Sequence, residues 1–163
     1  MRSPMIRVAI ITISDSCSQG EREDVSGRTI EEMLPRDRFA VAGRTIVPDG
    51  RETVAAELVR LADGGGVDLV LTTGGTGFGP RDVTPEATAS VCDRMAPGFG
   101  ELMRLEGFKK TPRAVLSRAV AGIRGRTLVV NLPGSPRAVR ECLEVIVDLL
   151  PHAIEMLRGG GHG

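Results

Sequence analysis

LTTGGTGFGPRDVTPE, residues 71–86, joins an apolar strand pattern to the start of a helix through a loop crowded with glycine. The strand pattern covers residues 67–71, and the helix start is Thr84-Pro85-Glu86, where a hydroxyl residue precedes a proline. Glycine at this density lets a backbone adopt positive φ and approach a ligand closely. At the carboxyl end of a parallel strand, beside a helix N-terminus, such a loop is typical of a cradle for phosphate or another anion.

The loop does not match the generic nucleotide-binding motifs. Gly74 and Gly79 have Walker A spacing, but Pro80-Arg81 stands where that motif has lysine and a hydroxyl residue. The dinucleotide fingerprint also fails, because its third glycine is missing. Asp82 does not suit a simple phosphate grip, and indicates a metal ion that accompanies the phosphates. Spacing alone leaves two interpretations, a phosphate or nucleotide site and a structural turn that only joins strand to helix.

The composition is that of an ordinary globular protein. The 163 residues predict one domain, residues 1–163, with residues 159–163 as a loose tail. Zero formal net charge without a basic cluster argues against a nucleic-acid partner. No apolar run could span a bilayer and no signal-peptide pattern is present, so we expect a cytoplasmic protein without a membrane partner. The three widely spaced cysteines lack a metal-ligand pattern and are expected to be reduced packing residues.

Strand and helix patterns alternate along the chain. Apolar, β-rich runs predict strands over residues 6–13, 39–47, 67–71, 119–123 and 127–132. Amphipathic patterns with helix starts and stops predict helices over residues 26–34, 51–62, 84–95, 98–106 and 136–150, the last continuing past Pro151 with a kink or break. Thr84 is the expected N-cap of its helix. This order predicts an α/β domain with three layers, α/β/α, around a mostly parallel central sheet.

Polar motifs follow the predicted strands directly. These motifs are Ser14-Asp15, Asp49, the loop that begins at Gly74, and Pro133-Gly134-Ser135. In a parallel sheet, ligands bind beyond the carboxyl ends of the strands, so the motifs are expected to converge on one site.

Each of these candidates also has a purely structural interpretation. Asp49 and Glu52 have the N-cap to N3 spacing of a capped helix start, and Ser135 before Pro136 is also typical of a helix N-cap. Asp82 could be a turn residue, and Ser14 and Asp15 could simply turn the chain. Ser117 and Arg118 could be surface residues.

The motifs together resemble a known family. The glycine loop followed by Arg81-Asp82-Val83-Thr84-Pro85-Glu86 looks like the signature of the molybdopterin-binding family, which includes MogA-type and MoaB-type bacterial proteins and the G domain of gephyrin. Further matching motifs extend the resemblance over nearly the whole chain: Ile13-Ser14-Asp15-Ser16, Asp24-Val25-Ser26-Gly27, Val47-Pro48-Asp49, Leu116-Ser117-Arg118, Ala121-Gly122-Ile123-Arg124-Gly125 and Asn131-Leu132-Pro133-Gly134-Ser135-Pro136.

The resemblance implies an enzyme of molybdenum cofactor biosynthesis with the fold of that family. Such an enzyme transfers an adenylyl group from ATP to the terminal phosphate of molybdopterin with the help of Mg²⁺, and pyrophosphate leaves. Two alternatives are a MoaB-type protein that binds molybdopterin or a precursor without turnover, and a scaffold. The resemblance also implies a homotrimer, with a hexamer as the alternative, and a molybdate-insertion protein as partner.

The resemblance also implies the site residues. Asp49 and Asp82 are the expected catalytic and metal-binding residues. Substrate contacts are expected from Ser14, Asp15, Gly74, Gly75, Thr76, Gly77, Arg81, Ser117, Arg118, Pro133, Gly134 and Ser135. One position departs from the pattern: Gly50 stands where many relatives carry a second acid, which would weaken a metal site that uses both acids.

Overall fold

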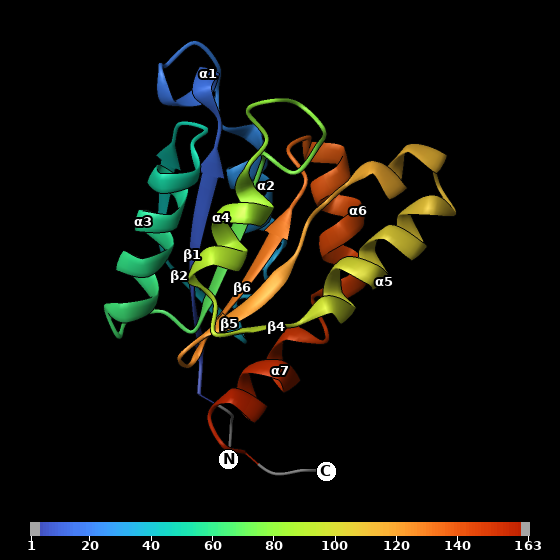
Figure 1. The fold of residues 1–163 in the computed structure, drawn as a ribbon. Coiled ribbons are helices and arrows are strands. Elements are labelled where there is room, and N and C mark those ends of the chain that lie inside the picture. Colours follow the sequence, from blue (N-terminus) through green and yellow to red (C-terminus); the bar gives the residue numbers. More distant parts are fainter. Residues whose placement is uncertain (1–3, 161–163) are drawn as a thin grey trace.

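The structure is a computed structural model, and it describes residues 4–160. Its centre is a six-stranded sheet in the order β2-β1-β3-β6-β5-β4 (Figure 1). The strands are β1 (Ile6–Ile13), β2 (Phe39–Val47), β3 (Leu69–Thr73), β4 (Arg94–Met95), β5 (Ala121–Arg124) and β6 (Thr127–Leu132). The helices are α1 (Asp15–Ser18), α2 (Val25–Met33), α3 (Arg51–Asp63), α4 (Thr84–Val91), α5 (Pro97–Phe108), the 3₁₀ helix η1 (Pro112–Leu116), α6 (Pro136–Ile146) and α7 (Leu150–Leu157).

The sheet is mostly parallel, as predicted. Strands β2, β1, β3 and β6 run in one direction, and only the β5 pairings, with β6 and with β4, are antiparallel. Parallel neighbours need crossover connections, which helices supply, whereas the short turn between β5 and β6 suits an antiparallel hairpin. The carboxyl ends of four strands therefore lie at one edge of the sheet.

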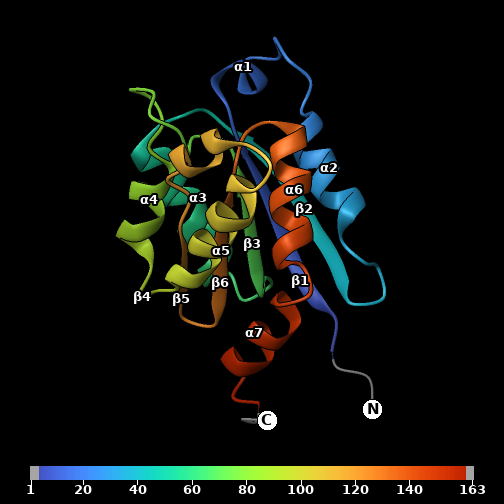
Figure 2. The same cartoon turned by 90° about the vertical axis from the view of Figure 1, so that its right-hand side faces the viewer.

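Helices cover both faces of the sheet, which confirms the three-layer prediction. Helices α3 and α4 lie on one face, and α2, α5 and α6 lie on the other (Figures 1 and 2). Strand β1 shows how one strand serves both cores. Val8 and Ile10 pack with α2 and α6, whereas Ala9 and Ile11 pack with α3. Because strand side chains alternate between faces, a continuous apolar run fits a strand buried on both sides.

The structure corrects several predicted boundaries. Helix α4 ends at Val91 rather than residue 95, because Asp93 and Ala96 donate backbone hydrogen bonds to β5 and form the short strand β4 between them. Strand β3 runs from Leu69 to Thr73, two residues later than predicted at both ends. Thr84 is already helical and does not cap α4. The long helix predicted from residue 136 breaks after Ile146, ahead of Pro151.

The structure describes the C-terminal end of the chain as far as Gly160. Helix α7 ends at Leu157 and Gly159 has φ +81°, whereas residues 161–163 of the expected tail lie outside the described residues. None of the helices within residues 4–160 combines the length and apolar character that a membrane crossing requires.

All three cysteines are free thiols. Burial raises the pKa of Cys92 and of Cys142 to about 11, which fits packing residues rather than reactive thiols.

Candidate functional site

The four predicted motif segments meet at the carboxyl edge of the sheet. The Ser14 amide donates to the carbonyl of Val47 at 2.9 Å, which joins the ends of β1 and β2. The Gly74 amide donates to the carbonyl of Leu132 at 3.2 Å, which joins the ends of β3 and β6. Figure 1 shows α1 and the neighbouring loops gathered beyond this edge. The convergence predicted from the strand ends is thus present in the structure.

A cavity of about 360 Å³ opens between these loops, and we call it the carboxylate pocket. It brings together seven of the predicted site residues: Ser14, Asp49, Gly74, Gly75, Asp82, Gly134 and Ser135. Arg22, Glu23, Asp24 and Ser26, which the sequence did not single out as site residues, also line it.

The glycine loop has no room for side chains where it meets the rest of the site. Gly74 and Gly75 have φ of +103° and +70°, a region that favours glycine. A β-carbon at position 74 would lie 2.2 Å from the carbonyl oxygen of Ile13, and one at position 75 would lie 2.2 Å from Oγ1 of Thr84. The Thr84 hydroxyl donates to the Gly74 carbonyl at 2.9 Å, so it fixes the loop instead of capping the helix.

The two expected catalytic carboxylates both lie against this loop. Oδ1 of Asp49 is 3.3 Å from where a β-carbon of Gly75 would stand. Oδ2 of Asp82 accepts the Gly79 amide at 2.9 Å and is equally close to the β-carbon positions of Gly77 and Gly79. The absence of side chains at these glycines therefore lets both carboxylates approach the loop backbone closely.

Asp49 and Asp15 bind each other's backbone. The Asp15 amide donates to Oδ2 of Asp49 at 3.0 Å, and the Asp49 amide donates to Oδ1 of Asp15 at 3.1 Å. The N-cap of α3 is Gly50, without a side-chain cap, so the capping interpretation of Asp49 does not hold. Asp49 instead connects the β2 loop to the β1 loop and keeps Oδ1 directed at the glycine loop.

The surroundings shift the pKa values of the Asp49 and Asp15 carboxyl groups in opposite directions. Burial raises the pKa of the Asp49 carboxyl, and the nearby charges of Asp15 and Asp82 raise it further. A hydrogen bond from Arg81 lowers the pKa of the Asp15 carboxyl. Arg81 binds Asp15 through Nε at 2.6 Å and Nη2 at 3.0 Å, and Nη2 also donates to the Asp49 carbonyl at 2.6 Å. Asp15 is thus neutralised within the protein, whereas Asp49 would gain from a cation.

Arg118 binds the glycine loop through both its backbone amide and its guanidinium. Its amide donates to the Thr76 carbonyl at 2.8 Å, Nε donates to the Gly77 carbonyl at 2.7 Å, and Nη2 donates to the Asp82 carbonyl at 2.7 Å. Nη1 forms an ion pair with Glu86, and this contact lowers the pKa of the Glu86 carboxyl. A substrate contact of Arg118 stays a prediction, since every nitrogen of its guanidinium already has a partner in the protein.

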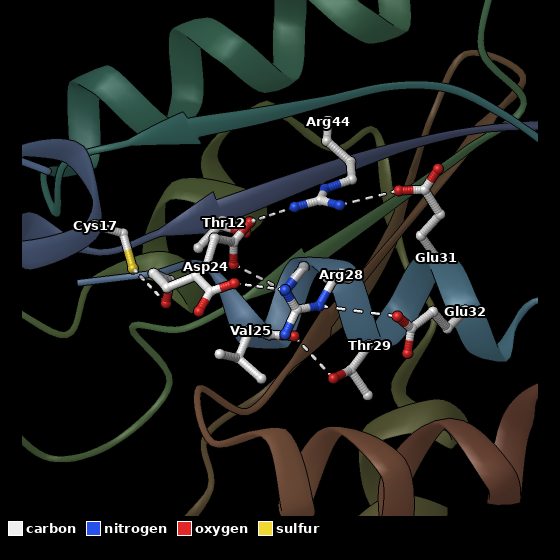
Figure 3. Close-up of polar contacts among 11 residues, drawn as sticks. Thr12, Cys17, Asp24, Val25, Arg28, Thr29, Glu31, Glu32 and Arg44 are labelled. Atoms are coloured by element: carbon white, nitrogen blue, oxygen red, sulfur yellow. Dashed lines mark hydrogen bonds and ion pairs between the residues drawn. The ribbon is translucent and has the colours of Figure 1, made fainter.

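A buried Asp24 anchors the side of the pocket that sequence reasoning missed (Figure 3). Its Oδ2 accepts the Thr12 hydroxyl at 2.8 Å and Arg44 Nη2 at 3.4 Å, and its Oδ1 accepts the Gly27 amide at 2.9 Å. Nearby, the Ser26 hydroxyl donates to the Gly134 carbonyl at 2.6 Å. The available signal was the acidic N-cap at the start of the Asp24-Val25-Ser26-Gly27 motif.

Ser117 and Pro133 line a second cavity of about 320 Å³, which we call the helical cavity. It lies between α5, η1 and α6, and residues such as Met103, Ala138 and Val145 give it mostly apolar walls. Arg104 Nη1 donates to the carbonyls of Ser117 and Ala119, at 3.3 and 2.8 Å, which fixes this segment of the cavity wall. The structure therefore places Ser117 outside the carboxylate pocket, and the consecutive residues Pro133 and Gly134 line the helical cavity and the carboxylate pocket, respectively.

Thr76, Gly77, Asp15, Arg81 and Arg118 surround the carboxylate pocket without lining it. Ser135 lines it and also caps α6 by accepting the Ala138 amide at 3.2 Å. Its capping role and a ligand contact therefore remain compatible.

Comparison with known proteins assigns this arrangement to a family. Residues 9–152 match the model of the family described as "Probable molybdopterin binding domain". The chain belongs to this family of molybdopterin-binding domains. A molybdopterin adenylyltransferase of Helicobacter pylori is 43% identical over 160 residues, covering 94% of this chain and 89% of that protein. The Escherichia coli K12 protein of the same name is 38% identical over 169 residues, covering 94% and 86%.

A solved structure of a related protein has the same architecture. The molybdopterin biosynthesis enzyme MoaB from Thermus thermophilus is 52% identical, with a TM-score of 0.90 over 95% of this chain and 98% of that one. The fold expected from the sequence resemblance is therefore confirmed.

We expect Asp49→Asn to stabilise the fold near neutral pH. Because the folded-state pKa of Asp49 is raised, the folded protein holds this proton more tightly than the unfolded chain, and stability falls as pH rises above the ordinary carboxyl pKa. Asparagine cannot ionise, and its side-chain oxygen can still accept the Asp15 amide. Thermal unfolding should give a higher Tm for the variant at neutral pH and a smaller difference near about pH 3. A lower Tm at neutral pH would contradict this account.

We expect Arg118→Gln to loosen the glycine loop. Hydrogen bonds to a charged group contribute about 1.5–3 kcal/mol each, so the amides of residues 76–83 should exchange roughly tenfold faster or more. Hydrogen exchange measured by mass spectrometry tests this. Arg137→Ala is the matched control, since the Arg137 side chain is 87% exposed and its only ion pair within residues 4–160 is with Glu141 on its own helix. Equal protection of the loop in both variants would show that Arg118 does not hold it.

Proposed function

We propose that this protein is a molybdopterin adenylyltransferase that works in molybdenum cofactor biosynthesis. In this reaction the terminal phosphate oxygen of molybdopterin attacks the α-phosphorus of ATP. The bond from the α-phosphorus to the bridging oxygen of the β-phosphate breaks, and that oxygen leaves with the electron pair as part of pyrophosphate. The product is adenylylated molybdopterin.

The observation that carries the proposal is the pair of carboxylates, Asp49 and Asp82, set against a glycine loop at the edge of the sheet. The attacking phosphate is already an anion, so the reaction needs no nucleophilic side chain and no histidine base. It needs in-line positioning and neutralisation of charge on several phosphates. A pocket of backbone amides and carboxylates, with a capped helix N-terminus at Ser135, suits those needs.

The adjoining helical cavity suits the pterin part of molybdopterin. Its mostly apolar walls can cover the faces of a flat ring, and the Ser117 hydroxyl and Arg104 offer polar contacts at its edge. Pro133 lines this cavity and the next residue, Gly134, lines the carboxylate pocket, so we expect molybdopterin to extend from one to the other.

The residues present fit Mg²⁺ that arrives with the nucleotide. Within residues 4–160 no group of three or more side chains forms a metal cage, but Mg²⁺ in nucleotide sites commonly uses one or two carboxylates together with phosphate oxygens. Burial and neighbouring carboxylates raise the pKa of Asp49, so a divalent cation would relieve a real electrostatic cost there. Asp49 and Asp82 would hold the ion, which supplies neutralisation of the phosphate charge. Gly50, which stands where many relatives carry a second acid, leaves both of these expected metal ligands, Asp49 and Asp82, in place.

The alternative is a protein that binds molybdopterin or a precursor without turnover. The similarity to a protein named MoaB keeps this alternative in view. Asp49 and Asp82 favour the enzyme, because a protein that only binds has no need of two carboxylates at a phosphate site.

We expect the protein to act in the cytoplasm as a homotrimer, with a hexamer as the alternative, and to pass its product to a molybdate-insertion protein. Exposed apolar side chains on the adjacent elements α5 and η1 support self-association: Leu105, Phe108, Val115 and Leu116. Such patches on a soluble protein mark interaction surfaces.

Purified protein with molybdopterin, ATP and Mg²⁺ should release pyrophosphate, and Asp82→Asn should slow that release about 100-fold or more. The loss reflects a carboxylate that acts on the charge of the transferring phosphate. Asp148→Asn is the matched control, because the Asp148 side chain is 83% exposed and pairs with Arg38 away from the pocket. Tight molybdopterin binding without pyrophosphate release in the wild type would replace the enzyme with the binding protein.

Light scattering coupled to gel filtration should give three times the chain mass of 17.3 kDa. A charge in the apolar patch should dissociate the assembly, so we expect monomer from the double variant Leu105→Glu, Val115→Glu. Met156→Glu is the control, since Met156 is also half-exposed but lies on α7. An unchanged mass in the double variant would place the interface elsewhere.

A further inference from the structure

Arg22 is the cationic side chain that lines the carboxylate pocket. Among the pocket-lining residues of the described chain, the other charged side chains are Glu23, Asp24, Asp49 and Asp82, all acidic. A polyphosphate that enters this pocket meets several carboxylates, and electrostatic repulsion would oppose its binding. A single well-placed cation therefore matters more here than it would in a basic pocket.

Arg22 differs from the other arginines around the site. Arg81 is committed to Asp15, and Arg118 is committed to Glu86 and two backbone carbonyls. Within residues 4–160 the guanidinium of Arg22 has neither a hydrogen bond nor an ion pair. Its acidic sequence neighbours pair elsewhere, Glu23 with Arg28 and Asp24 with Arg44. The donors of Arg22 are thus available to a ligand.

The connection that carries Arg22 is fixed on both sides. Before it, Gly20 has φ +75° and the Glu21 amide donates to the Ser16 carbonyl at 2.9 Å. After it, the buried Asp24 accepts hydrogen bonds from the Thr12 hydroxyl (Figure 3) and from the Gly27 amide. The exposed Arg22 side chain lines the pocket, and because the backbone around it is held, it can meet a ligand without rearrangement of the fold.

We propose that Arg22 binds the pyrophosphate portion of ATP, the group that leaves in the reaction proposed above, on which this inference rests. The in-line geometry of phosphoryl transfer places the leaving group on the far side of the α-phosphorus from the attacking phosphate. Molybdopterin approaches from the helical cavity at Pro133, so the leaving group points away from it, toward the solvent at the pocket rim. A guanidinium presents paired donors that match phosphate oxygens.

The test is calorimetric binding of inorganic pyrophosphate with Mg²⁺ to the wild type, Arg22→Ala, Arg22→Lys and Arg126→Ala. Arg126 is an exposed arginine in the β5–β6 turn, at the opposite edge of the sheet, and controls for the loss of one positive charge. We expect the Kd for pyrophosphate to rise about tenfold or more in Arg22→Ala at low salt, as for a lost charge-assisted hydrogen bond. Lysine should restore part of the affinity, and Arg126→Ala should leave it within about twofold of the wild type.

Binding of AMP and the two KM values show which phosphate group Arg22 contacts: the leaving pyrophosphate of ATP, its α-phosphate or the phosphate of molybdopterin. AMP lacks the leaving group, so its Kd should be the same in Arg22→Ala and the wild type. In turnover, Arg22→Ala should raise KM for ATP and leave KM for molybdopterin unchanged. A rise in KM for molybdopterin instead would assign Arg22 to the attacking phosphate and overturn the proposal.

Failure of this inference can be told apart from failure of the proposed function. Equal pyrophosphate affinity in Arg22→Ala and the wild type, with turnover intact, would remove the role of Arg22 and leave the transferase standing. A wild type that binds no pyrophosphate and releases none from ATP would overturn both. Far-ultraviolet circular dichroism and Tm of Arg22→Ala should match the wild type, because the side chain has no partner within the described chain to lose.

Discussion

The close approach of Gly74 to the end of β1 is the contact on which the rest of the site depends. A β-carbon at this position would stand 2.2 Å from the Ile13 carbonyl oxygen, and the backbone there has positive φ. The α-carbon of Gly74 is 3.5 Å from where a β-carbon of Gly134 would lie, so the loops after β3 and β6 also touch. Without this contact, the strand ends would still share an edge, but the loops could not enclose a pocket.

Arg118 and Arg81 stabilise the loops around the pocket. Arg118 and Arg81 use their donors on carbonyls and carboxylates of the loops, which fixes the backbone beside Asp82 and Asp49. Asp49 and Asp82 line the cavity without an arginine bound to either carboxylate within residues 4–160, and burial raises the pKa of Asp49, so its ionised form costs stability. Under the proposed function, binding of Mg²⁺ together with the nucleotide would offset this cost.

The sequence was sufficient for the fold and for the pocket residues that lie directly after strands. Continuous apolar runs and glycine punctuation are local signals, and a parallel sheet converts them into a shared edge. Arg118 could not be read in the same way, since its partners Gly77 and Asp82 lie 41 and 36 residues earlier along the chain. Nor could Ser117, because its assignment to the helical cavity depends on how α5, η1 and α6 pack. Arg22 carries no motif at all, and only the pocket around it shows its position.

The segment that contains Ser117 and Arg118 joins the two cavities physically. Ser117 lines the helical cavity, and Arg104 holds its carbonyl from α5. The next residue, Arg118, holds the carbonyls of Gly77 and Asp82 on the glycine loop. A pterin seated against Ser117 and a nucleotide held at Asp82 would therefore act on the same short stretch of backbone. Under the proposed function, one peptide unit and one guanidinium would then link the two substrate positions.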